Sequence, residues 1–415
     1  MTCPVSPQDL PGLRRRLGVV DAVTIGLGSM IGAGIFVALG PAAAAAGSWL
    51  LVGLAVAAVV AYCNATSSAR LAARYPHSGG AYLYGRERLG DFWGHLAGWS
   101  FVVGKVASCA AMALTVGVYI WPAHPHAVAV AAVVTLTAVN YCGIEKSATL
   151  NRIIVAIVLA VLTCVVIIGI SSGNADPGRL ELGSGHSVDG LLQAAALLFF
   201  AFAGYARIAT LGEEVRDPAR TIPRAIAISF GLALAIYTVV AVVAVTVLGA
   251  TVLAHSAAPL ADVVASVPGF EPVVRVGAAV AALGSLLSLI LGVSRTTLAM
   301  ARGGHLPGAL AAVHPRFGVP HRAELAVGLV VAVLAAFADV RGVIGFSSFA
   351  VLVYYAVANA SAITLGRRLI PVAGLAGCAM LAAALPIASI VAGVSVLALG
   401  AGAYALHRHQ RGGAA

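Results

Sequence analysis

Charged residues are scarce in this sequence. Asp, Glu, Lys and Arg make up 10% of the 415 residues, whereas 60% are hydrophobic and the mean hydropathy is +0.99. About a quarter of the residues of a soluble domain are charged, so this composition excludes that class. Apolar runs recur along the chain, and runs of about 17–25 residues are long enough to cross a bilayer as helices. We therefore expect an all-α polytopic membrane protein embedded in a lipid bilayer.

The sequence also lacks the patterns of a metal or redox site. Its six cysteines show no CxxC or CxxxC spacing and mostly fall within the apolar runs, and its eleven histidines lie in loops or at the ends of runs. We expect no acid within the membrane core. A membrane-embedded acyl or glycosyl transferase would need His, Asp or Glu gathered at one depth. We therefore expect no enzyme activity, no metal and no cofactor.

The apolar runs predict about twelve transmembrane helices. The last two runs are separated only by Leu385-Pro386, so one re-entrant hairpin is the alternative for them. The expected helices are 19–46, 48–70, 92–121, 126–144, 150–172, 190–212, 224–250, 272–301, 323–338, 343–366, 369–385 and 387–406.

Acidic residues are outnumbered by basic ones, and the net charge is +10. Loops rich in Lys and Arg stay on the cytoplasmic side of a membrane. With a cytoplasmic N-terminus, alternate loops carry nineteen Lys and Arg, and the opposite loops carry only Arg179, Arg275 and Arg341. The basicity therefore reflects topology, and we expect no nucleic-acid partner. The expected location is the cytoplasmic membrane, with many passes and both termini in the cytoplasm.

The first apolar run contains an unusual concentration of glycine. Gly26–Phe36 holds four glycines, and each costs a helix interior about 1 kcal/mol relative to alanine. Backbone freed from a helix at membrane depth is tolerated where it lines a cavity, and broken helices are typical of secondary transporters. The alternative is a close-packing face of small residues. We predict a discontinuous helix 1.

The sixth run repeats this anomaly. Phe199–Arg207 interrupts it with small residues and an arginine. The two breaks are five helices apart, so helices 1 and 6 cross in opposite directions, as a 5+5 inverted repeat with discontinuous helices 1 and 6 requires. The expected parts are a cytoplasmic N-terminal tail (1–18), a first repeat of helices 1–5 (19–172), an external loop (173–189), a second repeat of helices 6–10 (190–366), helices 11–12 (367–406) and a cytoplasmic tail (407–415).

Three basic residues fall within the predicted helices. Lys105 lies thirteen residues past Phe92, about 20 Å into the membrane. A buried lysine can gain and lose a proton, so Lys105 is the candidate coupling residue; snorkelling to the surface is the alternative. Arg207 has two interpretations. It either forms a salt bridge with the nearby acidic residues or extends to the membrane surface, or else it is a possible pathway charge that lines the inner half of the transport pathway. Arg295 is expected to support packing near the cytoplasmic face.

Several short motifs follow one another from the first helix to the loop after the eighth. They are Gly28–Phe36, Tyr75-Pro76-x-Ser78-Gly79-Gly80-x-Tyr82, Gly98-Trp99, Phe199-Phe200-Ala201-Phe202-x-Gly204, Glu213-Glu214-Val215-x-Asp217-Pro218, Ile222-Pro223-Arg224-Ala225 and Ala301-Arg302-x-Gly304-x-Leu306-Pro307. Together with the two breaks, these motifs resemble the amino acid–polyamine–organocation superfamily, the amino acid permeases. The resemblance implies twelve helices in an inverted repeat and the transport of amino acids or related amines.

An amino acid needs donors for its carboxylate and acceptors for its ammonium close together. Unwound backbone in helix 1 can offer N–H groups, and freed carbonyls in helix 6 can accept from the ammonium. The candidate substrate-binding residues are Ser29, Met30, Ile31, Gly32, Ala33, Gly34, Phe200, Ala201, Phe202, Ala203 and Gly204. Phe200 stands at the family's gating-aromatic position, so the resemblance implies that it closes over the substrate.

Two departures from the family pattern narrow the expected function. Many proton-coupled relatives have a lysine on helix 5, where this chain has Val158, and an acidic residue in helix 6 is replaced by Ala206 followed by Arg207. We therefore expect a secondary active transporter that carries a neutral or acidic amino acid with protons. Sodium is the alternative coupling ion, because Ser285 and Ser288 offer hydroxyls. An amino acid exchanger and a non-transporting nutrient sensor are the alternative functions.

Overall fold

The computed structural model describes residues 17–75, 79–143, 148–182, 187–209, 211 and 214–412. These residues form α-helices, short 3-10 turns and one isolated bridge between Leu17 and Val215. Several residues of the sequence analysis lie outside the described residues. They are Pro76, Ser78 and Glu213 of the motifs, and Arg14, Arg15, Arg16 and Lys146 of the nineteen basic loop residues.

Each of the twelve predicted helices corresponds to a helix or to a set of shorter helical pieces. In order they are α1 (Val19–Met30) with α2 (Ala33–Val37) and α3 (Leu39–Ala46), α4 (Leu50–Arg74), α6 (Asp91–Ile120), α7 (Pro125–Tyr141), α8 (Ala148–Ser171), α9 (Val188–Phe202) with α10 (Ala206–Ala209), α11 (Pro218–His255), α13 (Phe270–Arg302), α14 (His321–Phe337), α15 (Val340–Ile363), α16 (Leu369–Ala383) and α17 (Ile387–Gly412). Within the described residues, nine helical segments are long and apolar enough to cross a membrane, and α7 and α16 are shorter apolar helices. The all-α polytopic fold is confirmed.

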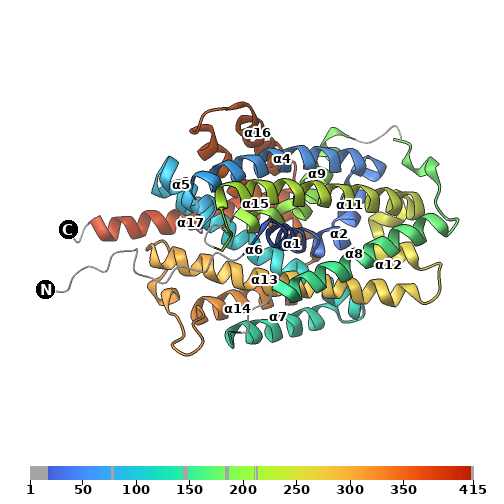
Figure 1. Cartoon of the computed structure of the whole chain (residues 1–415), viewed down its shortest axis with the longest axis horizontal. Coiled ribbons are helices and arrows are strands. Elements are labelled where there is room, and N and C mark those ends of the chain that lie inside the picture. Colours follow the sequence, from blue (N-terminus) through green and yellow to red (C-terminus); the bar gives the residue numbers. More distant parts are fainter. Residues whose placement is uncertain are drawn as a thin grey trace.

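Short elements connect the long helices. They are the 3-10 turns η1 (Gly47–Trp49), η2 (Pro177–Leu180), η3 (Ala203–Tyr205) and η4 (Gly308–Ala311), and the helices α5 (Ala81–Leu89) and α12 (Pro259–Val264). The long helices run roughly along one axis of the molecule (Figure 1). In that view α16 lies at one edge and α7 at the other, with α1, α2 and α6 between them. Because α6 packs against both α13 and α15 and is buried over most of its length, it forms the centre of the core.

Both predicted breaks are present. Helix 1 leaves helical geometry at Ile31 and Gly32 (φ −83°, ψ −140°) and resumes as α2. Helix 6 changes at Ala203 into the 3-10 turn η3 and ends as the four-residue α10. The second break is therefore tighter than the first. The division into two inverted repeats stays a prediction.

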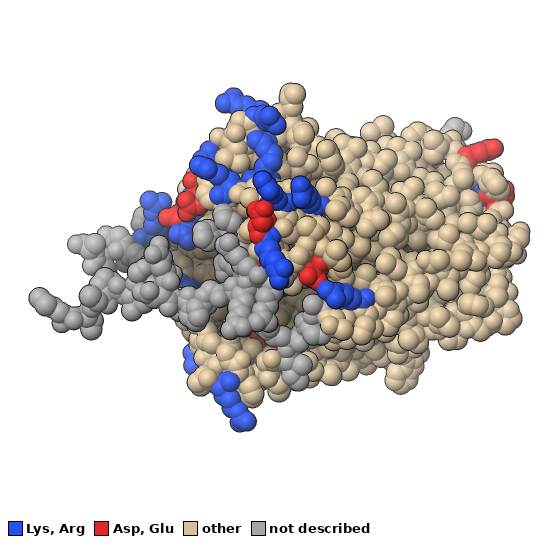
Figure 2. All heavy atoms as spheres, in the orientation of Figure 1, with Lys and Arg blue, Asp and Glu red and all other residues tan. Residues whose placement is uncertain are grey.

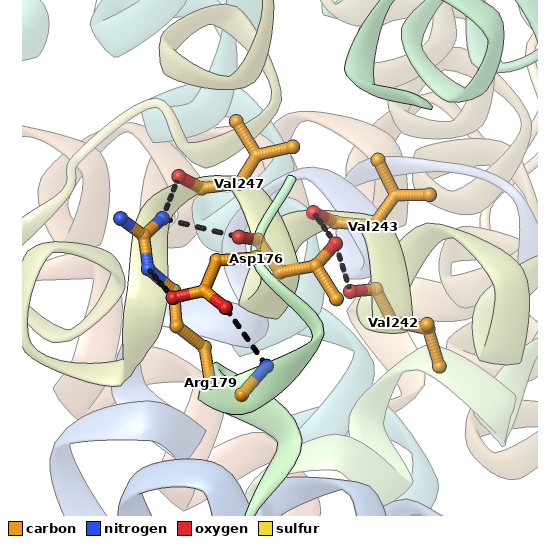
Figure 3. A network of polar contacts seen from close by, with 7 residues as sticks. Asp176, Arg179, Val242, Val243 and Val247 are labelled. Carbon is orange, nitrogen blue, oxygen red and sulfur yellow. Dashed lines mark hydrogen bonds and ion pairs between the residues drawn. The ribbon is translucent and has the colours of Figure 1, made fainter. Parts of the chain in front are cut away.

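The end of the molecule away from α17's C-terminus contains a third irregularity, which the sequence did not predict. Gly249 has φ +72° inside α11 and so interrupts its hydrogen bonding. Arg179 of η2 donates from Nη1 to the carbonyl oxygens of Thr246 (3.1 Å) and Val247, and Asp176 donates its backbone N–H to Thr246 O at 3.0 Å. Figure 3 shows Asp176 and Arg179 meeting over this stretch of α11. The predicted external loop 173–189 thus caps a kinked helix.

The basic side chains gather at one end of the molecule. Figure 2 shows most of the visible Lys and Arg near the end at which α17 terminates, with acidic residues visible at the opposite end. Several of these arginines hold the short connections in place. Arg70 donates to the carbonyl oxygens of Gly366 (2.6 Å) and Arg367 (3.1 Å), and Arg88 donates to Thr364 O at 2.8 Å. The charge asymmetry expected from the sequence is therefore a feature of the folded shape.

Candidate functional site

A cavity of about 380 Å³ lies between the two broken helices and α6 and α13. Its wall includes Ser29 of helix 1, Ala203 and Gly204 of helix 6, and Lys105 of α6. It extends past Arg295 to Gly318 and Pro320, in the connection before α14. Pockets of about 300–1,000 Å³ are typical of small-molecule sites. The cavity is thus large enough for an amino acid and reaches toward the basic end of the molecule.

The two breaks touch each other behind this cavity. A Cβ added to Gly204 would lie 2.3 Å from Ser29 O, and a Cβ added to Gly34 would lie 2.7 Å from the Cα of Ala201. Both clashes are with backbone, which cannot swing aside as a side chain can. Glycine at these positions is therefore needed for the close approach of helices 1 and 6.

Side chains from neighbouring helices satisfy the carbonyl groups near the breaks. The Tyr237 hydroxyl of α11 donates to Met30 O at 2.6 Å and to Ala201 O at 2.9 Å, so one phenol bridges both breaks. The Ser285 hydroxyl of α13 donates to Gly28 O at 3.0 Å. Because a buried carbonyl without a partner is costly, these contacts stabilise the interrupted helices. The sequence did not single out Tyr237, since one tyrosine in an apolar run carries no local signal.

Lys105 contacts the second break directly. Its Nζ donates to Ala203 O at 3.2 Å, and the Tyr355 hydroxyl of α15 approaches the same oxygen at 3.3 Å. Only 6% of the Lys105 residue surface is exposed. The ammonium thus points at helix 6 and the cavity, and does not extend to the membrane surface. Among the described residues, Lys105 and Glu324 are the two members of the Asp, Glu, Lys and Arg group that are buried.

The other candidate binding residues divide into two sets. Ser29, Ala203 and Gly204 line the cavity. The remaining candidates lie outside the described wall of this cavity: Met30, Ile31, Gly32, Ala33, Gly34, Phe200, Ala201 and Phe202. Phe202 packs its ring 5.6 Å from Phe230 and 5.1 Å from Tyr237, and Phe200 is 7% exposed. The gating role of Phe200 stays a prediction.

The cavity wall is rich in positive charge. Its described residues include Lys105, Arg207 and Arg295, against one carboxylate, Glu214. Arg207 thus lines the cavity, and so does Glu214, one of the nearby acidic residues with which Arg207 was expected to pair. Arg295 was expected to support packing near the cytoplasmic face. It also lines the cavity, because α13 borders the cavity from Ser285 to Ala299.

Glu324, in the first turn of α14, is a buried acid that the sequence did not single out, because it is 0% exposed. The sequence placed this residue at the edge of an apolar run, where a carboxylate ordinarily reaches water. Packing of α14 against α7 and α13 closes that route. The absence of an acid from the membrane core stays a prediction.

The helix 5 position that holds lysine in many proton-coupled permeases is apolar in this chain. Val158 is 2% exposed and borders a void of about 10 Å³ together with Ile31, Ile154 and Val155. A void this small has room for at most about one water molecule. Val158 therefore offers no titratable group, and Lys105 is the cation that approaches a helix break instead.

Comparison with known proteins places the chain among transporters. The family model described as "Amino acid permease" matches residues 17–408. An uncharacterized transporter of Mycobacterium bovis is 70% identical over 98% of this chain and 95% of its own length. Cationic amino acid transporter 7, chloroplastic, of Arabidopsis thaliana is 30% identical over 84% of this chain and 65% of its own length. The branched-chain amino acid permease BcaP of Bacillus subtilis is 28% identical over 78% of this chain and 74% of its own length.

The family match covers nearly all of the described helices, including both breaks. The motifs that suggested the amino acid–polyamine–organocation superfamily are thus confirmed as a true resemblance. Together with the broken helices and the cavity between them, the match identifies a multi-pass membrane transporter and not an enzyme. The chain belongs to the amino acid permease family.

Proposed function

We propose that the protein is a secondary active transporter that carries a neutral or acidic amino acid across the cytoplasmic membrane together with protons. The observation that supports this most directly is the contact between Lys105 Nζ and Ala203 O at the cavity wall. It joins an ionisable group to a broken helix, and broken helices are the moving and binding parts of such transporters. Transport then proceeds by alternating access, with the cavity open to one side at a time.

The backbone at the breaks is proposed to hold the amino and carboxyl groups of the substrate. N–H groups of the Ser29–Gly34 stretch would donate to the carboxylate, and carbonyls of the Phe200–Gly204 stretch would accept from the ammonium. Phe200 is proposed to close over the bound substrate and exclude water. Movement of the helix 6 half that carries Phe200 would bring it to the cavity, since its ring is packed away from the wall in this structure.

The charge of the cavity supports the choice of substrate class. Lys105, Arg207 and Arg295 outnumber Glu214 among the described wall residues. Buried or partly buried charges are screened little by salt, so they act strongly on a charged ligand. A substrate side chain that is neutral or anionic suits this wall better than a second ammonium. The proposed substrate class thus differs from the one in the names of the cationic amino acid transporters.

Lys105 is proposed to be the coupling residue. When protonated, it holds α6 to the helix 6 break through Ala203 O. When deprotonated, it loses the charge that strengthens this hydrogen bond, and the break is freer to move. Protonation would thus shift the balance between the inward and outward states. Sodium is the alternative coupling ion, and the oxygens of Ser285 and Ser288 at the cavity wall are its candidate ligands.

The orientation is proposed from the charge distribution. Loops rich in Lys and Arg remain in the cytoplasm, so the basic end in Figure 2 would be cytoplasmic, with both termini on that side. The cavity extends toward the loops of this end, where Gly318 and Pro320 line it. The structure would then represent an inward-facing state.

Uptake into proteoliposomes tests the proposed function. Labelled L-leucine, L-glutamate and L-arginine would be supplied to vesicles with an inside-alkaline pH gradient or with none, in sodium-free buffer. We expect leucine or glutamate to accumulate only with the gradient. Uptake that ignores the gradient but requires internal amino acid would identify an exchanger. Binding of an amino acid without any flux would identify a nutrient sensor and contradict the transport proposal.

A further inference from the structure

Glu324 is a buried carboxyl group for which the proposed transport cycle has no role so far. It is 0% exposed, and neither Oε1 nor Oε2 has a hydrogen-bond partner in the described part of the chain. An isolated ionised carboxylate is very costly to bury, so such a group is either paired with a cation or carries a proton. Glu324 therefore needs one of these two explanations.

The α7 helix faces Glu324 but donates no hydrogen bond to its carboxyl group. Gly328, one turn further along α14, lies against α7, since a Cβ there would be 2.6 Å from Thr137 Oγ1. One turn before Glu324, the His321 ring lies 6.3 Å from the Tyr141 ring of α7. Glu324 therefore lies opposite the α7 segment between Thr137 and Tyr141. Thr137 Oγ1 is itself buried without a described partner.

Two contacts tie this carboxyl to the cavity. The α13 helix packs against α14 and carries Arg295, which lines the cavity. The carbonyl oxygen of Pro320 accepts from the backbone N–H of Glu324 at 2.9 Å, and Pro320 lines the same cavity. The positive charge of Arg295 acts on the Glu324 carboxyl. Among the other elements packed against α14, η4 carries no titratable side chain. The remaining titratable groups on the packed helices are His321 and Arg322 on α14, His126 and Tyr141 on α7, Asp91, His95, Lys105, Cys109 and Tyr119 on α6, and Glu271, Arg275 and Arg302 on α13.

We propose that Glu324 is a proton-binding site linked to the cavity through Arg295. With its O–H bond intact, Glu324 is neutral and leaves the positive field of Arg295 directed at the cavity. When that bond breaks, the proton passes to water, the electron pair stays on the carboxylate, and the new negative charge attracts the Arg295 guanidinium. The carboxylate of Glu324 then competes with an anionic group of the substrate for the same cation.

This competition couples the two ligands. A proton on Glu324 strengthens the binding of a substrate carboxylate, and by linkage the bound carboxylate strengthens the binding of the proton by the same factor. The inference rests on the proposed function, because it names a second protonation site for the same cavity. It differs from the role of Lys105, since Glu324 would act on substrate affinity and Lys105 on the position of helix 6.

Infrared difference spectroscopy of the purified full-length protein tests the proton site without any substrate. The wild-type protein is expected to show the C=O band of a protonated carboxyl group that disappears on alkaline titration. Glu324→Gln keeps the shape of the side chain and should lose this band. Glu271→Gln is the matched control, because Glu271 is partly exposed and paired with Arg275 at 2.7 Å. A titrating band that persists unchanged in Glu324→Gln would overturn the proposal.

Binding of labelled L-glutamate as a function of pH tests the linkage. The wild-type affinity should weaken with rising pH by up to about tenfold per pH unit, the limit for one linked proton. Glu324→Gln should hold the high affinity of the acidic form at every pH. An identical pH dependence in both proteins would refute the linkage. If neither L-glutamate nor L-leucine binds to the wild type, the proposed function fails, and the infrared titration still decides whether Glu324 holds a proton.

Discussion

Lys105 is the residue on which the proposed coupling depends. Replacing it with methionine keeps most of the side-chain volume and removes the charge and the hydrogen bond to Ala203 O. We expect Lys105→Met to abolish accumulation driven by a pH gradient while exchange of internal for external amino acid continues. Proteoliposome uptake with and without the gradient measures both activities.

Lys105→Arg is the matched control for charge. Arginine retains a cation but does not release its proton in proteins, so it should also lose gradient-driven accumulation. Gradient-driven uptake at the wild-type level in Lys105→Met would rule out Lys105 as the coupling residue.

Tyr237 is predicted to contribute to stability through its two hydrogen bonds. Tyr237→Phe removes the hydroxyl that donates to both Met30 O and Ala201 O. Leaving a buried group without its partner costs about 1–3 kcal/mol. We expect a lower thermal midpoint in detergent. Tyr119→Phe loses a single bond, to Phe36 O at 2.9 Å, and should lower the midpoint less; an equal or smaller loss for Tyr237→Phe would contradict this account.

At the level of residues, the sequence indicates those whose role follows from residue type and from position along a predicted helix. Lys105 could be found because its distance from the start of the helix places it at mid-membrane. Tyr237 and Tyr355 could not, because their role arises from the carbonyls that tertiary packing brings to them. Glu324 was missed for a similar reason, since only the packing of α14 against α7 and α13 removes its access to water.

At the level of elements, the breaks in helices 1 and 6 were the most predictable features. Glycine weakens a helix wherever it occurs, so the four glycines of Gly26–Phe36 mark the first break without reference to its neighbours. A second role of glycine at the breaks could not be predicted from the sequence. The backbone of the opposite break passes so close to Gly34 and to Gly204 that neither position has room for a Cβ. The kink at Gly249 was missed because one glycine in a long apolar run is not distinctive.

Gly204→Ala tests the contact between the breaks. Its Cβ would lie 2.3 Å from Ser29 O and 2.6 Å from Met30 N, so the two helices must separate. We expect loss of transport and a lower thermal midpoint. Gly231→Ala in α11 is the control, because nothing lies within 4 Å of its added Cβ and alanine stabilises a helix by about 0.5–1 kcal/mol relative to glycine. If Gly204→Ala transported as well as Gly231→Ala, the close contact would not matter for function.

At the level of the whole molecule, hydropathy and charge settled the fold class. The apolar runs predicted the helices, and the uneven distribution of Lys and Arg predicted the basic end seen in Figure 2. What they did not predict is the position of the cavity along the molecule. That depends on which ends of helices 1, 3, 6 and 8 are spread apart, and the sequence is the same in an inward-facing and an outward-facing state.

The direction in which the cavity opens gives a prediction for the entire structure. Ser288 lines the cavity, whereas Asn174 is exposed in the loop after α8, at the opposite end. In a background with the native cysteines replaced, a membrane-impermeant maleimide should label Ser288→Cys only from the side of the basic loops. Asn174→Cys should be labelled only from the other side. Labelling would be measured in right-side-out and in inside-out membrane vesicles.

The geometry of the cavity determines from which side Ser288→Cys can be reached. A maleimide that cannot cross the membrane needs a water-filled route, and the cavity provides one from Ser288 to Gly318 and Pro320. On the other side, the contact of Gly34 with Ala201 leaves no space even for a Cβ. A substrate bound in the cavity should slow the labelling of Ser288→Cys and leave that of Asn174→Cys unchanged. Equal labelling of Ser288→Cys from both sides would mean that the closed breaks do not seal the pathway, and alternating access through this cavity would have to be abandoned.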